Sequence, residues 1–190
     1  MTHESNAPSL ELAGAFSDRS AAHDAARRIG GNVYEDQRED PSKLPFAALV
    51  TGVTDDPTIL AESADVGMYL VCRRVIKPGA AEVYGLFPML RHPQKTHEQA
   101  DAHWRDVHGP LALEHHAFMS HYVQLSVLHT LAGTAFDGFA MCGFKSISDL
   151  KERFFTTEES VAVIAADIQN FADTPRSPRR LIATPTDYAA

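Results

Sequence analysis

Residues 103–111 read HWRDVHGPL, and they lie within a stretch that holds eight of the chain's ten histidines. Upstream, Thr96 and Gln99 have the spacing of a capping box, which predicts that a helix begins there. Trp104 and His108 are four residues apart, so both lie on one stripe of this helix, the stripe that faces a core or a pocket. The stretch therefore predicts a helix with an imidazole on its buried face.

The residues after His108 predict where this helix ends. Pro110 biases Gly109 away from helical geometry, so we expect the chain to break there and to restart with Pro110 in a new first turn. A histidine that titrates near neutral pH beside irregular backbone suits general acid or base work. The alternative is a helix-terminal histidine that bonds a free backbone carbonyl.

Working outward from this helix, hydrophobic periodicity, caps and turn residues predict one order of elements in both halves of the chain. In the second half the predicted elements are strand 81–92, a helix from Thr96, strands 121–131 and 139–146, a helix from about 149 to 171, and strand 179–188. In the first half they are strand 10–16, a helix from 17 or 18 to 30, strands 32–37 and 44–54, a short helix 58–64, and strand 66–78. Both halves read β-α-β-β-α-β.

This order predicts an α+β protein made of two ferredoxin-like repeats, over residues 1–78 and 79–190. Each repeat would have two helices on one face of a four-stranded sheet, and its other face would be apolar and uncovered. Packing the two sheets face to face gives a barrel whose interior can hold a small ligand. The alternative is that residues 1–65 form an irregular extension and that a homodimer closes the barrel.

The stretch HWRDVHGPLALEHHAFMSHYVQ, residues 103–124, resembles the signature of the EthD-like family within the dimeric α+β barrel superfamily. The matching residues are Trp104, His108, Gly109, Pro110, Leu111, Tyr122 and Gln124. Further on, AADIQNFAD resembles the late helix of the family, which carries an Asp and, in its last turn, a Phe. In this chain these residues are Asp167 and Phe171. The likeness covers roughly residues 81–190. The first half has no HGPL, so we expect it to be a degenerate copy that supplies pocket walls.

The resemblance implies a fold more firmly than a reaction. Related barrel families include cofactor-free cyclases, isomerases, dehydratases and quinone-forming monooxygenases acting on aromatic or polyketide-like compounds, and also haem-dependent enzymes.

The histidine spacing does not predict a local metal site. Two ligands on one helix must be three or four residues apart, and no two of the clustered histidines are. His103 is five residues from His108, which in an α-helix points it about 140° away, so we expect it at the surface. We expect the same of His97, His115 and His116. Ligands converging from separate elements, or haem on one axial histidine, remain the alternatives.

The alternation of residues in strand 121–131 assigns its side chains to two faces, but it does not tell which face points into the barrel. His121 shares one face with Val123 and Leu125, while Tyr122 and Gln124 share the other. One of these faces lines the barrel, and the other lies under the helices. Tyr122 could hydrogen-bond a carbonyl in a pocket, although buried tyrosines more often satisfy a structural partner.

The remaining candidates form an aromatic lining. Tyr69 and Tyr84 lie on strands that we expect to face the chamber, and Trp104 and Leu111 belong to the central signature. Such a lining with few polar groups is typical of a small-molecule site, although core packing also explains it.

Composition and missing motifs narrow the function further. The net charge of −8 argues against nucleic acid, and no apolar run approaches the roughly 20 residues of a membrane span. The N-terminus lacks the features of a secretion signal, so we expect a cytoplasmic protein, and Cys72 and Cys142 lie in apolar segments typical of reduced thiols. Nucleotide, phosphate, acyl-serine and CxxC motifs are missing, so we expect no organic cofactor.

These observations favour a cofactor-independent lyase, dehydratase, cyclase or isomerase acting on a small aromatic or polyketide-like compound. His108 would be the acid or base and Tyr122 the group that polarises an oxygen. Trp104, Leu111, Tyr69, Tyr84, His121 and Gln124 are the expected substrate-binding residues. The alternatives are a non-catalytic binding protein of a degradation pathway, or an oxygenase that uses substrate electrons or haem.

Overall fold

The computed structural model describes residues 7–40 and 43–188. The elements of the first repeat are β1 (Ser9–Phe16), α1 (Arg19–Ile29), β2 (Asn32–Asp36), β3 (Ala48–Gly52), α2 (Thr58–Ser63) and β4 (Gly67–Lys77). Those of the second repeat are β5 (Val83–Met89), α3 (His97–His103), η1 (Trp104–His108), α4 (Gly109–His115), β6 (His121–Gly133), β7 (Gly138–Phe144), α5 (Ile147–Glu152), α6 (Glu158–Ile168) and β8 (Leu181–Asp187). The predicted order β-α-β-β-α-β is therefore found twice.

The eight strands form one closed barrel in the order β1-β3-β2-β8-β5-β7-β6-β4, and every neighbouring pair is antiparallel. Each repeat contributes four adjacent strands, and the seams between the repeats are β2 with β8 and β4 with β6. The fold class read from the sequence is thus confirmed. The alternative in which the N-terminal part of the chain forms an extension and a second copy closes the barrel is wrong, because β1 to β4 complete it within one chain.

The inside of the barrel is a packed core. Inward side chains from both repeats form one buried cluster that includes Phe46, Leu49, Tyr69, Leu125 and Phe139. The ring centroids of Phe46 and Tyr69 lie 6.1 and 5.3 Å from that of Phe139, a normal separation for aromatic packing. We expected the ligand chamber between the sheets, and this expectation is wrong: bulky aromatic side chains from opposite walls meet there.

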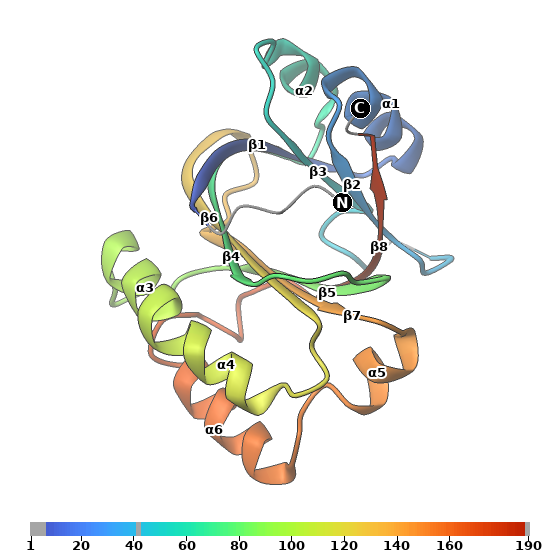
Figure 1. Cartoon of the computed structure of the whole chain (residues 1–190). Helices are drawn as coiled ribbons and strands as arrows, with labels where there is room; N and C mark the ends of the chain where they lie inside the picture. Colours follow the sequence, from blue (N-terminus) through green and yellow to red (C-terminus); the bar gives the residue numbers. More distant parts are fainter. Residues whose placement is uncertain (1–6, 41–42, 189–190) are drawn as a thin grey trace.

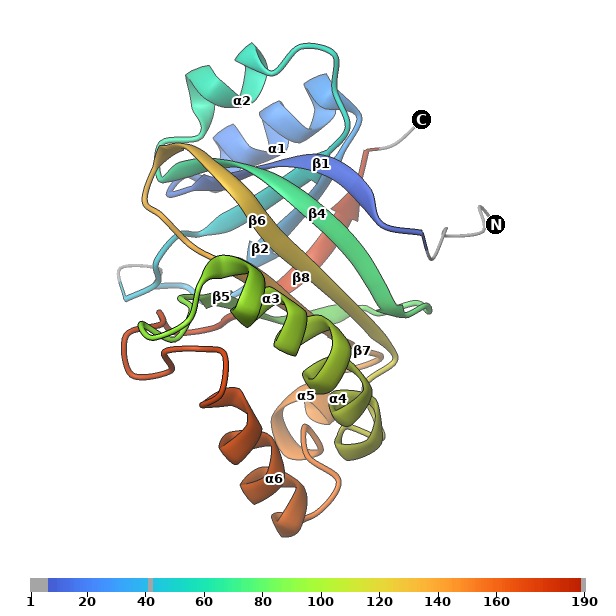
Figure 2. The same ribbon diagram turned by 90° about the vertical axis from the view of Figure 1, so that its left-hand side faces the viewer.

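The helices of the two repeats lie on opposite sides of the barrel (Figures 1 and 2). On the first repeat, α1 packs closely on the outer face of the sheet because its buried residues are the small Ala22, Ala25 and Ala26. On the second repeat, the continuous helix α3–η1–α4 and helix α6 carry the larger Trp104 and Ile164 on their buried faces. Within the described residues, no helix is long and apolar enough to cross a membrane.

Candidate functional site

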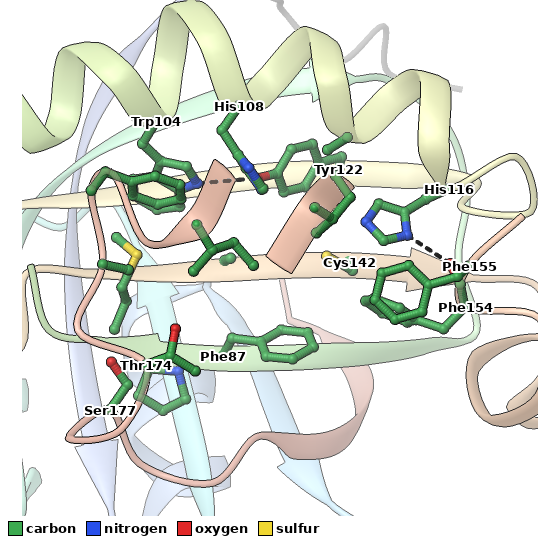
Figure 3. Close-up of a pocket in the computed structure, with 18 of the residues that line it drawn as sticks. Phe87, Trp104, His108, His116, Tyr122, Cys142, Phe154, Phe155, Thr174 and Ser177 are labelled. Carbon is green, nitrogen blue, oxygen red and sulfur yellow. Dashed lines mark hydrogen bonds between the residues drawn. The ribbon is translucent and has the colours of Figure 1, made fainter. Parts of the chain in front are cut away.

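The second repeat encloses a cavity of about 250 Å³ between its helices and the outer face of its sheet. The helical wall comes from η1, α4 and α6, and the opposite wall from β5, β6 and β7 together with the 172–178 loop. The lining is mostly apolar and includes the aromatic rings of Phe87, Trp104, Phe154, Phe155 and Phe171. In Figure 3, Trp104, His108, Tyr122 and His116 follow one another beneath the helix, while Phe87, Thr174 and Ser177 lie across from them. Within the part of the chain that the structure describes, no Lys, Arg, Asp or Glu lines the cavity.

His108 borders this cavity and is held from behind by Asp167 of α6. The distance from His108 Nδ1 to Asp167 Oδ2 is 2.8 Å, and the histidine is 7% exposed. A carboxylate only accepts hydrogen bonds, so Nδ1 carries the proton and Nε2 keeps its lone pair. Burial lowers the pKa of His108 below its usual 6.5, although the Asp167 hydrogen bond and charge act to raise it. The ring is therefore neutral at neutral pH, with Nε2 able to accept a proton.

A widened helical turn brings a second histidine to the same carboxylate. Residues Trp104–His108 form a π-helix, in which the N–H of Gly109 bonds the carbonyl of Trp104 five residues earlier. His103 and His108 are also five residues apart, and His103 Nε2 lies 2.7 Å from Asp167 Oδ1. We predicted that these histidines would diverge and that His103 would be solvated. That prediction is wrong, because it assumed the angular spacing of an α-helix and the chain here is wound more widely.

The expected break at Gly109 does not occur either. The backbone of Gly109 is right-handed helical, with φ -54 and ψ -58 degrees, so the helix passes directly into α4. Pro110 lies in the first turn of α4. Proline lacks the N–H that would continue the regular bonding, and a π turn next to it keeps the chain helical without that donor. Pro110 is thus accompanied by an irregular backbone, but this is the wider π turn that ends at His108 and not a break at Gly109.

Tyr122 on β6 takes part in a buried polar network with helix η1. Its hydroxyl accepts hydrogen bonds from Trp104 Nε1 at 3.1 Å and from Gln124 Nε2 at 3.3 Å. The Gln124 amide is oriented by its 2.9 Å bond to the Trp104 carbonyl, so its nitrogen, not its oxygen, faces the tyrosine. Among the described residues, the Tyr122 O–H hydrogen has no acceptor. Burial raises the pKa of Tyr122, so the group stays protonated and can donate into the cavity.

His116 is a cavity residue that the sequence reasoning missed. We expected it in solvent, but it is 3% exposed and its ring lies 4.6 Å from that of Phe154. A signal was present: Trp104, His108, Ala112 and His116 recur every four residues, and all four line the cavity. The stripe that identified His108 therefore extended two turns further.

Three predicted substrate-binding residues lie in the wrong place for that role. Tyr69, Tyr84 and His121 point into the packed barrel interior, where Tyr84 Oη lies 2.7 Å from His121 Nδ1 and Tyr69 donates to the Thr134 carbonyl. The reason is the pleat of the strands: on β6, the face with Tyr122 lies under the helices, so the face with His121 lies inside the barrel. These three residues are separated from the cavity by the sheet itself.

Two further predicted residues do not line the cavity. Gln124 is fully buried and braces Tyr122 and the Trp104 carbonyl. Leu111 is half-buried on α4 and lies off the stripe that faces the sheet. Of the predicted site residues, the structure thus brings Trp104, His108 and Tyr122 together around one cavity. Over residues 7–40 and 43–188, no three His, Cys, Asp or Glu side chains are grouped so that they could hold a metal ion.

Comparisons with known proteins show which domain and which fold this chain resembles. Residues 92–175, which span α3 to α6 and the loop that follows α6, match the model of the EthD domain. A solved structure described as "Crystal structure study of anthrone oxidase-like protein" superposes with a TM-score of 0.52 over 98% of this chain and 95% of that one, at 11% sequence identity. No curated protein matches the chain. At such low identity the structural likeness establishes a shared fold only. The segment that builds the helical wall of the cavity, residues 92–175, is thus similar to the EthD domain, and in this chain it forms part of an α+β barrel.

Proposed function

We propose that the cavity binds a small aromatic ketone and that His108 removes a proton from it as a general base. One observation carries the proposal: in a single apolar cavity, His108 Nε2 and the Tyr122 O–H both lack a partner among the described residues. His108 Nε2 can accept a proton, and the Tyr122 O–H can donate a hydrogen bond to an oxygen atom. A ligand that offers a donor to Nε2 and an acceptor to the O–H completes the hydrogen bonding of both groups.

The chemistry follows from these two groups. A proton leaves a carbon conjugated with the ligand's carbonyl and passes to His108 Nε2. The electron pair of the broken C–H bond moves into the carbonyl, and the resulting enolate oxygen accepts the Tyr122 hydrogen bond. Asp167 stabilises the imidazolium that forms. Returning the proton from His108 to another carbon of the enolate gives an isomer, and loss of a β-hydroxyl that takes this proton gives water and a dehydrated product. Attack of the enolate carbon on a second carbonyl of the same molecule, whose oxygen takes the proton, closes a ring. The proposal therefore covers isomerase, dehydratase-type lyase and cyclase reactions.

Proton exchange tests this step without knowledge of the natural substrate. Anthrone, an aromatic ketone with an acidic methylene group, is incubated with the protein in D₂O, and loss of the methylene signal is followed by proton NMR. We expect the wild-type protein to accelerate exchange and His108→Asn to be slower by about 10²–10⁴-fold. Asparagine keeps an N–H for Asp167 but lacks Nε2, so the fold is preserved. Exchange at the wild-type rate in a folded His108→Asn protein contradicts the proposal.

A second candidate function is oxidation, which the description of the structural relative as anthrone oxidase-like favours. Removal of the same proton would precede transfer of electrons from the carbanion to dioxygen. Oxygen uptake with anthrone, compared with exchange under nitrogen, separates the two. Uptake that depends on His108 supports the oxidase, exchange without uptake supports the lyase or isomerase class, and binding with neither supports a non-catalytic carrier.

A further inference from the structure

We infer that His116 is a second binding residue of this cavity, whose Nε2 accepts a hydrogen bond from an aromatic hydroxyl at the end of the ligand away from His108. The inference rests on the proposed function, because it describes the ligand of the same cavity. It identifies the substrate class more narrowly, as an elongated hydroxy-aromatic compound.

The hydrogen bonds of His116 determine which ring nitrogen is available. Its Nδ1 lies 2.6 Å from the Phe154 carbonyl oxygen, and a carbonyl only accepts, so Nδ1 carries the proton. Burial lowers the pKa of the ring below 6.5. In the neutral ring, Nε2 is therefore an acceptor, and among the described residues it has no donor. Because His116 lines the cavity and is 3% exposed, this acceptor is available to a molecule inside the cavity.

The surroundings of His116 indicate what kind of hydroxyl it receives. Its ring centroid lies 4.6 Å from that of Phe154 and 5.0 Å from that of Phe155. Both phenylalanines line the cavity at this end (Figure 3). A flat, apolar group packs well against such a cluster of rings, and a phenol presents its O–H in the plane of that group. An aliphatic alcohol would not match these ring faces as well.

The spacing of the two histidines indicates how long the ligand is. His116 follows His108 by eight residues, which at about 1.5 Å per residue corresponds to roughly 12 Å along the helix axis. Two fused rings, with a hydrogen bond of about 2.8 Å at each end, cover a separation of this size. The ligand therefore has its carbonyl or acidic group near His108 and Tyr122, and its second hydroxyl near His116.

A pair of probes tests this inference: 2-naphthol, with one hydroxyl, and 2,6-dihydroxynaphthalene, with hydroxyls at both ends of the long axis. Trp104 is the chain's one tryptophan and lines the cavity, so quenching of its fluorescence reports the Kd of either probe. For the wild-type protein, we expect the dihydroxy compound to bind about 3- to 12-fold more tightly, as one additional hydrogen bond predicts.

The decisive variant is His116→Asn, whose side-chain N–H can still donate to the Phe154 carbonyl while Nε2 is lost. We expect the preference for the dihydroxy compound to fall to about twofold, the statistical value for two equivalent orientations. His129→Asn, at an exposed position on β6, is the matched control and should keep the wild-type preference. A wild-type preference in His116→Asn, equal weakening of both probes, or failure of both probes to bind the wild-type protein overturns the inference.

A measurement on the unaltered protein guards against a variant that fails to fold. Nitrogen-15 spectra of the histidine rings should show the Nε2 resonance of His116 moving when 2,6-dihydroxynaphthalene is added, and no movement contradicts the inference. These binding results are independent of proton exchange. If exchange fails while the preference depends on His116, the proposed reaction is wrong and the ligand assignment stands; the reverse outcome removes only the role of His116.

Discussion

His108 and Asp167 are joined by a 2.8 Å hydrogen bond between Nδ1 and Oδ2, across 59 positions of the chain. The bond connects the helix η1 to α6 and leaves Nε2 as the ring nitrogen that has no partner over residues 7–40 and 43–188. His103 bonds the other oxygen of the same carboxylate. The carboxylate therefore acts as the common support of two histidines from one π turn, and only one of the two rings reaches the cavity.

Asp167→Asn tests this support. The amide removes the negative charge that stabilises a protonated His108, so we expect anthrone proton exchange to slow by about 10- to 100-fold. Asp167 acts to raise the His108 pKa, so the acid limb of the rate profile should move to lower pH in the variant. The measurement is the exchange rate across the acid limb of that profile. Asp106→Asn is the control: this aspartate lies on η1, as His108 does, but it bonds the exposed Arg105, so both quantities should stay unchanged.

Tyr122→Phe tests the proposed oxygen donor. Phenylalanine keeps the ring that packs under the helix but removes the O–H, so we expect exchange to slow by about 10²–10³-fold, the loss found for one missing oxyanion donor. Trp104 Nε1 also loses its acceptor, at a stability cost of about 1–3 kcal/mol. Exchange kinetics and urea unfolding separate the two effects. An unchanged rate in the folded variant would remove Tyr122 from the reaction.

The acid sensitivity of stability follows from the buried histidines. The pKa values of His108 and His116 are both lowered by burial from 6.5. Relative to an unfolded chain with ordinary histidines, stability is therefore unaffected by these groups above pH 6.5 and decreases as the pH falls below it, toward the folded-state values. We expect Tm to fall on acidification, by about 2–4 °C for each kcal/mol lost. His116→Asn should make this decline shallower, and an equally steep decline would show that His116 does not contribute.

The buried ion pair between Arg74 and Asp101 predicts that substitutions at these two positions have coupled effects on stability. Arg74 is 5% exposed, and its two terminal nitrogens lie 3.0 and 2.5 Å from the oxygens of Asp101. Asp101→Asn leaves the arginine charge buried without its partner, so we expect a loss of about 3–5 kcal/mol in the free energy of unfolding. Replacing both residues, as Arg74→Met with Asp101→Leu, should recover most of that loss. Urea denaturation of the two single variants and the double variant measures the coupling, and additive losses would contradict it.

The sequence by itself determined the order of elements and the face of the central helix. Caps, turns and hydrophobic periodicity act over a few residues, so β-α-β-β-α-β could be read twice. The four-residue spacing of Trp104 and His108 placed both on the buried stripe for the same reason. Alternation on residues 121–125 likewise separated His121 from Tyr122 correctly.

Only the tertiary structure decided which of those faces meets the ligand and which histidines take part. The barrel interior is filled because large side chains from both repeats converge there, which no single strand reveals, and the cavity lies on the opposite face of the sheet. The π turn at Trp104–His108 and the position of Asp167 depend on the packing of two helices whose contacting residues are 59 and 64 positions apart. Local patterns report which side of an element is buried, whereas the identity of its neighbour is set by contacts between segments distant in the chain.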